Sequence, residues 1–334
     1  MSCRLLPASG FPAIAPRWDH LNTQHYRHPL LESRFYQAAL QHLSRGDEQI
    51  ALCETAQETA AIAIIRSKKF GTWTTFQPSQ APMGALIKAP GLLPTNLAAD
   101  LLRVLPPSCQ LLALTQQDPH IVARPDNGAK LKTLDYIDTA RITVDSPFDE
   151  YWAGRGKNLR HNIKRQRNRL KRDGIELRVD VVTDHDQISE GIRLYGALES
   201  RGWKAQGGTA IHPDNKQGRF YLDLLERYAT TGSARIYLCY YSDRLAAVDL
   251  CILNQTALVI LKTTYDETIS TSSPAMVMRS EYFRPIFDEQ QVERIEFYGK
   301  VMDWHTKWSN EIRRMYHLNA YRSSLLAWLH SQGM

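Results

Sequence analysis

The chain has 334 residues and a net charge of +6, with 43% hydrophobic and 23% charged residues. This composition is typical of globular proteins and excludes a disordered chain, while the length favours two domains. No stretch approaches the roughly 20 consecutive apolar residues that a membrane-spanning helix needs. The first sixteen residues contain three prolines and lack the long apolar core of a signal peptide.

The cysteines argue against two kinds of covalent site. They are five in number, at Cys3, Cys53, Cys109, Cys239 and Cys251, and no two have CxxC spacing. This pattern is evidence against a disulfide framework and against a cysteine zinc site. We therefore expect a cytoplasmic protein without a metal.

The first half alternates predicted helices with short predicted strands. Helices are expected at 28–43 and 92–105, the second ended by Pro106 and Pro107. The segment 49–68 predicts two strands around a polar turn, and 72–87 predicts a strand, a proline-containing loop and a strand. Two more short strands are expected at 110–117 and 138–144.

The second half repeats a similar order. Strands are predicted at 175–184 and 291–299, with three more within 233–266. Helices are predicted at 155–172, 185–203, 219–232 and 272–287, and a helix or turn at 303–315. Both halves thus contain helices followed by antiparallel strands. This order predicts an α/β fold made by duplication, with a boundary between residues 144 and 150.

The segment 155–172 is the most unusual stretch of the chain. Nine of its eighteen residues are Lys or Arg and none is acidic. Leu159, Ile163 and Leu170 recur at roughly helical spacing, which predicts an amphipathic helix with a narrow apolar stripe. So dense a cationic face favours a nearby anion, most simply phosphate from a cofactor, a nucleic acid or a membrane. A plain solvated face is the alternative.

Several motifs in order resemble one family. They are the basic helix, LESRGWKAQGG, AAVDLCIL with TTYD and SSPAMV, and EFYGKVMDWHTKW. Over about 145–318 this resembles the C-terminal domain of GNAT-superfamily acyltransferases of the cellulose-biosynthesis (CelD/BcsL) type. More distantly it is similar to the Fem-type peptidyltransferases, which take an aminoacyl group from tRNA.

The resemblance implies tandem GNAT-like domains, each a mostly antiparallel sheet flanked by helices. Residues 1–145 would form a degenerate GNAT-like domain and 146–334 the acyltransferase domain. Three features differ from the family pattern. Ala275 replaces the glycine of an S-P-G turn, Trp304-His305 replaces Tyr-Lys, and the glycine-rich pyrophosphate signature is absent.

The resemblance and the residues together suggest a donor site. Ser273 followed by Pro274 is the pattern of a helix N-cap and first helical residue. Free N–H groups at that helix start suit a pyrophosphate, although a plain cap is the alternative. The predicted cofactor-binding residues are Ser272, Ser273, Ala275, Arg160 and Lys164.

Candidate catalytic residues come from strands and the turn after the last motif. Asp249 lies in an apolar strand and would serve as a base, or else pair with a buried Arg. His305 would accept a proton from the attacking amine near neutral pH, with Asp303 orienting it. The alternative for His305 is a packed aromatic turn. Tyr298 or Tyr265 would protonate the leaving thiolate.

Candidate substrate contacts are mainly aromatic and basic. Arg201, Trp203 and Lys204 precede a Gly-Gly loop, where an Arg and an aromatic ring suit a clamp. A helix end with a buried Trp is the alternative. Trp304, Trp73 and Gln77 are predicted to line the acceptor cleft between the domains.

The sequence therefore predicts an N-acyltransferase that moves an acyl group, most simply acetyl, from acyl-CoA to a small-molecule or peptide amine by direct attack. Acetyl-CoA or another acyl-CoA would be the co-substrate. A Fem-like enzyme that uses aminoacyl-tRNA is the second hypothesis. A non-catalytic module that binds an anionic surface is the third.

Overall fold

The computed structural model describes residues 1–69, 71–201, 211–212 and 214–332. The chain divides into two compact units, residues 1–139 with 313–334, and residues 140–312. The expected second domain included residues 313–334, but the structure groups them with unit 1, because β13 (Glu311–Tyr321) pairs with β6 (Leu111–Gln117). Strands β7 (Leu131–Thr143) and β13 contribute residues to both units.

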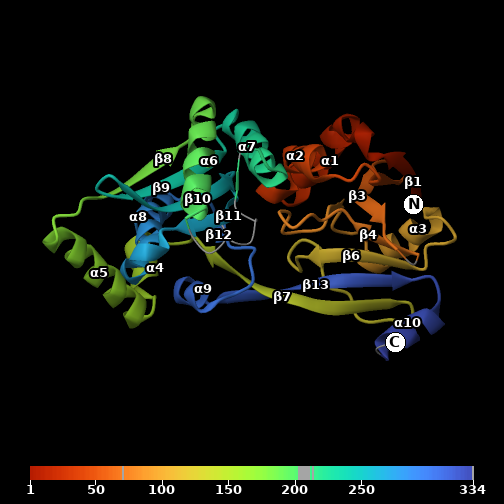
Figure 1. Cartoon of the computed structure of the whole chain (residues 1–334). Helices are drawn as coiled ribbons and strands as arrows, with labels where there is room; N and C mark the ends of the chain where they lie inside the picture. The colour runs from red at the N-terminus through yellow and green to blue at the C-terminus, as the bar shows by residue number, and fades with distance from the viewer. Residues whose placement is uncertain (70, 202–210, 213, 333–334) are drawn as a thin grey trace. The chain divides into compact units, whose positions relative to one another are not determined.

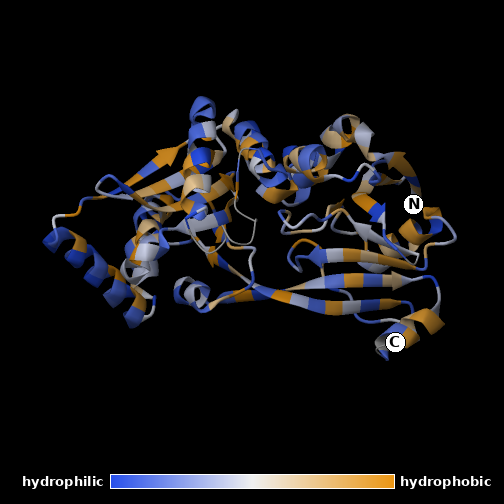
Figure 2. Cartoon of the chain, in the orientation of Figure 1, coloured by the Kyte–Doolittle hydropathy of each residue, from blue (hydrophilic) through white to orange (hydrophobic). Residues whose placement is uncertain are grey.

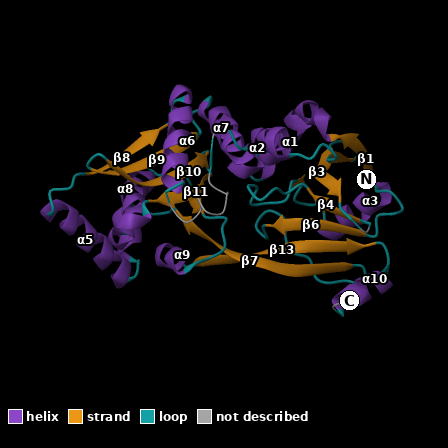
Figure 3. Cartoon of the chain, viewed as in Figure 1, coloured by secondary structure: helices purple, strands orange, loops and turns teal. Residues whose placement is uncertain are grey.

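Unit 1 is built on a mostly antiparallel sheet (Figures 1 and 3). The strand order is β1 (Ser2–Pro7), β2 (Gln49–Glu54), β3 (Thr59–Ser67), β4 (Thr72–Thr75), β6 and β13, with β5 (Leu86–Lys88) also on β3. Its helices are α1 (Phe11–His25), α2 (Ser33–Leu43), α3 (Pro94–Val104) and α10 (Ser324–Ser331). Helix α1 contacts β3 and β5, and α3 contacts β1. The buried side chains of α3, β3 and β6 form one core cluster.

Two expectations for unit 1 are corrected. Helix α1 was not predicted, because its prolines were taken as breaks. Pro12 lies in the first turn, where proline is tolerated, and only Pro16 lies further inside. The expected absence of disulfides is also wrong, since Cys3 and Cys53 lie opposite each other on β1 and β2 and are bonded.

Unit 2 has its own strand order, β12 (Arg294–Glu296), β11 (Ala257–Tyr265), β10 (Arg244–Leu253), β9 (Ala234–Tyr241) and β8 (Leu177–Val182). Strands β11 and β12 are parallel, and the other neighbours in this series are antiparallel. The last residues of β7 pair with β12. All five strands were predicted. Of the helix or turn expected at 303–315, the first part is α9 (Asp303–Trp308), but residues 311–315 belong to β13, for which no strand was predicted.

Helices cover both faces of the unit 2 sheet. Ile236 and Tyr237 are consecutive on β9, so they point to opposite faces. Ile236 contacts the position of Gly191 on α6 (His185–Glu199), whereas Tyr237 stacks on Tyr282 of α8 (Pro274–Asp288). Helix α7 (Lys216–Ala229) packs with α6, and α4 (Phe148–Ala153) and α5 (Lys157–Arg172) pack with α8.

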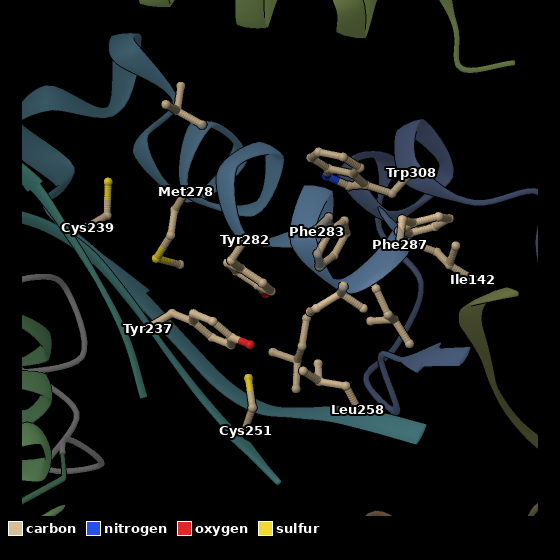
Figure 4. Close-up of a cluster of buried hydrophobic side chains, with 14 of the residues drawn as sticks. Ile142, Tyr237, Cys239, Cys251, Leu258, Met278, Tyr282, Phe283, Phe287 and Trp308 are labelled. Carbon is tan, nitrogen blue, oxygen red and sulfur yellow. The ribbon is translucent and has the colours of Figure 1, made fainter. Parts of the chain in front are cut away.

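The core of unit 2 lies between the sheet and α8. Figure 4 shows Tyr237 and Tyr282 side by side, with Phe283 nearby on the same helix as Tyr282. The rings of Tyr237 and Tyr282 are stacked with centroids 3.8 Å apart. Leu159, Ile163 and Leu170 of α5 are buried in this cluster, so the apolar stripe predicted for the basic helix is confirmed.

No helix in the described part of the chain combines the length and the apolar composition required to cross a bilayer.

Candidate active site

The central feature of unit 2 is the incomplete pairing of β11. Only residues 257–259 of β11 pair with β12, which ends at Glu296, while β11 continues to Tyr265. On the other side, Lys262 lies opposite Leu250 but Ile260 lies opposite Cys251, so Leu261 has no partner on β10. Leu261 is therefore a β-bulge residue, a feature that often occurs beside active sites.

The segment after β11 leads into α8. Residues Glu267–Ser272 form a short 3₁₀ helix, and Ser272 donates a hydrogen bond from Oγ to the carbonyl of Ile269 at 2.6 Å. Ser273 is the N-cap of α8 and Pro274 its first residue, as predicted. Ser273 has a left-handed backbone (φ 51°, ψ 51°), and its side chain makes no capping bond. Ala275, the second helical residue, is half-buried.

The basic helix packs against this segment through polar side chains. Gln166 is buried and donates from Nε2 to the carbonyl of Thr271 at 3.0 Å. Asn162 donates from Nδ2 to Oγ of Ser273 at 3.4 Å. Asn162 and Gln166 are four residues apart, so they lie on one helix face. Neither residue was predicted from the sequence, because the pattern of α5 draws attention to its charges alone.

The cations of α5 line two grooves. The larger, of about 750 Å³, includes Thr271 beside the loop that precedes α8. Its α5 residues are His161, Lys164, Arg165, Gln166, Asn168, Arg169 and Arg172. The smaller, of about 260 Å³, is lined by Arg160 together with Phe148, Trp152 and Ser280. Figure 2 shows how strongly hydrophilic this helix is.

The two predicted cofactor residues of α5 therefore differ in position. Lys164 lines both grooves, whereas Arg160 lines only the smaller one. The Nε of Arg160 donates to the carbonyl of Arg155 at 3.1 Å. Arg165, which lines the larger groove, is the cation that hydrogen-bonds Asn162, at 3.0 Å.

Asp249 is completely buried and fully paired. Its carboxylate accepts two hydrogen bonds from Arg279 at 3.1 Å, one from Tyr282 at 2.8 Å and one from Thr263 at 2.5 Å. The side chain of Arg279 is only 2% exposed. This is the buried-arginine pairing that the sequence analysis left open for Asp249. Burial lowers the pKa of Arg279, but the charge of Asp249, the influence of Tyr282 and the hydrogen bonds to both together outweigh it, so the pKa is raised.

His305 is buried on α9 and lies against two aromatic rings. Its ring stacks on Trp304 with centroids 3.5 Å apart and meets Phe297 edge-on at 5.4 Å. The guanidinium of Arg279 lies 4.4 Å from the Trp304 ring. Burial, the main cause, and the charge of Arg279 together lower the pKa of His305 to about 4. The expectation that His305 titrates near neutral pH is therefore corrected.

The other predicted catalytic residues have different environments. Asp303 is exposed, and within the described chain no hydrogen bond joins it to His305. Tyr298 is buried, two residues after β12. Tyr265 is 41% exposed at the end of β11.

The predicted substrate contacts belong to both units and differ in burial. Arg201 is exposed in the turn after α6, whereas Trp203 and Lys204 lie outside the described residues. Trp304 is half-buried in unit 2. Trp73 of unit 1 is buried in the core on β4. Gln77 of unit 1 donates from Nε2 to the carbonyls of Pro78 and Ala81.

A second buried polar cluster lies on the α6 side of the sheet and was not predicted. The Lys262 ammonium lies 3.4 Å from Oε1 of Glu199 and donates to Gln217 at 2.9 Å. Glu199 also accepts a hydrogen bond from the backbone of Ile211 at 2.7 Å. Lys262 follows the bulge residue Leu261, so this cluster lies beside the part of β11 that does not pair with β12. The sequence signal was a lone Lys after the apolar run of β11.

Within the described part of the chain, no group of His, Cys, Asp and Glu residues has the arrangement of a metal site.

Comparison with known proteins defines the fold. Residues 157–306 match the acetyltransferase (GNAT) domain family. No curated protein sequence matches the chain. The two units together have the mixed α/β architecture of tandem GNAT proteins, as expected from the sequence. The narrower resemblance to the cellulose-biosynthesis type stays a prediction.

Three solved structures are similar over nearly the whole chain. The C-terminal domain (DUF2156) of a putative lysylphosphatidylglycerol synthetase from Agrobacterium fabrum has a TM-score of 0.60 and 13% identity, with 96% of each chain covered. FemX has a TM-score of 0.60 and 9% identity, covering 94% of this chain and 98% of its own. A tandem GNAT protein from the clavulanic acid biosynthesis pathway has a TM-score of 0.50 and 10% identity, covering 96% and 98%. At these identities the similarity establishes the fold alone.

Proposed function

We propose that the chain is an N-acyltransferase that moves an acyl group, most simply acetyl, from acyl-CoA to the amine of a small molecule or peptide. The observation that carries the proposal is the course of β11. Residues 260–265, except the bulge residue Leu261, pair with β10 but not with β12, and they lead through the short 3₁₀ helix to the start of α8, which is packed against the basic helix. A thioester arm and a phosphate group can therefore be bound by consecutive parts of one segment.

In this proposal, the start of α8 binds the donor's pyrophosphate. The N–H groups of Ser273 and Met276 already donate to backbone carbonyls, and Pro274 has none. The N–H of Ala275 and the positive end of the helix dipole would therefore favour the anion there. Ser272, Ser273 and Ala275 form this start, and Lys164 and Arg165 provide cations from the adjoining groove. The pantetheine arm would lie along the part of β11 that β12 leaves unpaired.

The reaction proceeds by direct attack. The amine nitrogen forms a bond to the acyl carbon, and the carbonyl oxygen gains negative charge as the tetrahedral intermediate forms. The C–S bond then breaks, and the proton lost by the amine balances the one gained by the thiolate. The backbone N–H of Leu261, the bulge residue without a register partner on β10, is our candidate for polarising the carbonyl, because hydrogen-bond donors directed at a developing oxyanion lower the barrier. Tyr298, close to the end of β12, is our candidate for the proton donor to sulfur.

The donor site is tested by placing a charge at the start of α8. In Ala275→Glu, a carboxylate near the helix N-terminus suits the dipole, so stability should not fall. It would repel a pyrophosphate at about 5 Å by a few kcal/mol, so the Kd for acetyl-CoA should rise about 10- to 100-fold. Calorimetry measures the affinity, and thiol release with a panel of amines measures turnover.

The matched control is Ser324→Glu, which places the same charge on the first residue of α10 in unit 1. It should leave acetyl-CoA affinity unchanged. Failure of the native protein to bind acetyl-CoA, or equal affinity in Ala275→Glu, would contradict the proposed donor site.

Aminoacyl-tRNA is the second candidate donor, and the larger groove along α5 favours it. That groove has four Lys or Arg side chains and no acidic one among its lining residues. If it binds an RNA backbone, log K should fall with log salt by roughly 0.7 to 0.9 per phosphate contacted. Changing Lys164, Arg165, Arg167 and Arg169 to Gln should then remove both the affinity for bulk tRNA and most of the slope.

The control changes four exposed cations of unit 1, Arg45, Lys69, Arg103 and Lys130, to Gln, which lowers the net charge equally. Suppose that the native protein binds tRNA at micromolar concentration with a steep salt dependence, that only the α5 variant loses this binding, and that acetyl-CoA does not bind. The donor would then be aminoacyl-tRNA and not acyl-CoA. A shallow slope in all three proteins supports CoA. Binding without turnover of either donor would indicate a non-catalytic module.

A further inference from the structure

His305 is held in a single tautomer by the backbone. The N–H of Met302 donates to Nδ1 of His305 at 2.9 Å. A ring nitrogen that accepts a hydrogen bond carries no proton, so the proton of the neutral ring is on Nε2. Among the described residues, no hydrogen-bond partner is found for Nε2. The ring therefore has one unused donor.

The surroundings of this ring oppose a second proton. His305 is 4% exposed, lies against the rings of Trp304 and Phe297, and is influenced by the charge of Arg279 on α8. The charged neighbours on its own helix, Asp303 and Lys307, are both exposed. Burial and the Arg279 charge both lower its pKa, so the ring is neutral throughout the physiological range.

A series of contacts also connects the His305 ring with the part of β11 that β12 leaves unpaired. Arg279 donates from Nη2 to Oγ1 of Thr263 at 2.6 Å, two residues beyond the bulge. The same guanidinium lies over Trp304, on which His305 stacks. Phe297, whose ring meets both His305 and Trp304 edge-on, directly follows the last residue of β12. His305 thus lies where β11 and β12 cease to pair.

We propose that His305 is a hydrogen-bond donor, through Nε2–H, to the thioester end of the acyl donor, and not the base that deprotonates the acceptor. This inference rests on the proposed function. As the amine attacks, the carbonyl oxygen and then the sulfur gain negative charge, and Nε2–H donates to them without losing its proton. The proton of the attacking amine leaves to water, and the thiolate gains one from the Tyr298 hydroxyl, which water reprotonates, so the imidazole is unchanged at the end.

A donor of this kind has a different pH dependence from a base. A histidine base that titrates near neutral pH must lose a proton before the reaction, so the rate would rise through its pKa in that range. A ring that is already neutral has no such limb between pH 5.5 and 8. Removing one hydrogen-bond donor to a developing oxyanion typically lowers kcat by about 10²- to 10³-fold.

Two substitutions separate this role from a structural one. In His305→Asn, the side-chain oxygen reaches the position of Nδ1 and can accept from Met302, but nothing reaches the position of Nε2. In His305→Gln, the longer amide places an N–H near the position of Nε2. The donor role predicts that Asn lowers kcat about 10²- to 10³-fold while Gln retains most of it, with KM for acetyl-CoA little changed in both.

Nitrogen-15 NMR of the histidine ring provides a readout that needs no turnover. We expect the Nε2–H tautomer of His305, with no titration between pH 5.5 and 8, in the protein without substrate. A Nδ1–H tautomer, or native activity in His305→Asn, would overturn the inference. Absence of any acyl transfer by the native protein would instead count against the proposed function and leave the NMR result intact.

Discussion

Replacing Asp249 by Asn tests whether the buried cluster of unit 2 is a structural element. Asp249 is 0% exposed and accepts four hydrogen bonds, two of them from a guanidinium that is itself only 2% exposed. Asn removes the negative charge and turns one acceptor into a donor that faces other donors. Breaking a buried ion pair from one side costs about 3–5 kcal/mol, because the remaining charge is uncompensated.

The measurement is urea unfolding followed by circular dichroism, with Arg279→Met and the double variant alongside. We expect Asp249→Asn to lower the free energy of unfolding by about 3–5 kcal/mol and the double variant to recover part of it. Turnover per folded molecule should change far less than turnover per total protein. A loss of stability below about 1 kcal/mol, or full stability with no turnover, would refute this reasoning and restore Asp249 as a catalytic group.

Two further predictions concern stability alone. The pKa of His305 is lowered to about 4 by folding, so the unfolded chain binds the extra proton between about pH 6.5 and 4. The free energy of unfolding should therefore decrease as the pH is lowered across that window, by up to about 3 kcal/mol. A buffer-corrected unfolding series in which His305→Asn shows the same dependence on pH would contradict this. Ser323 caps α10 through its side chain, whereas Ser273 makes no capping bond to α8. Ser323→Ala should thus cost about 1 kcal/mol and Ser273→Ala clearly less, and thermal unfolding would expose an equal loss as the opposite result.

Local patterns predicted the elements that have strong periodicity. The buried stripe of α5 follows from Leu159, Ile163 and Leu170 alone, and the five strands of unit 2 follow from apolar runs between turns. Helix α1 was missed because proline was weighed by its average effect, although Pro12 occupies a helical position that needs no N–H. Strand β13 was missed because Ile312 is exposed and Arg313 is buried in an ion pair with Asp118, the reverse of what the local sequence indicates.

The candidate site depended on pairings between distant residues. Arg279 is thirty residues from Asp249 and was not identified as its partner. The disulfide depends on the register of β1 and β2, which places Cys3 opposite Cys53, and the spacing of the cysteines in the sequence does not predict this register. The catalytic role expected for His305 in the last motif stays a prediction. The protonation state of His305, however, is set by burial and by Arg279, neither of which the local sequence contains.

The discontinuity of unit 1 has a consequence for how the chain is made. Residues 313–316 supply buried partners for its earlier part, since Arg313 pairs with Asp118 and Tyr316 donates to the carbonyl of Val122. Ribosomes add residues in order and domains usually fold as units. Unit 2, continuous from 140 to 312, is synthesised in full while the sheet of unit 1 still lacks β13. The segment translated first is therefore the one that completes its native contacts last, and until then its β6 edge is open to other strands.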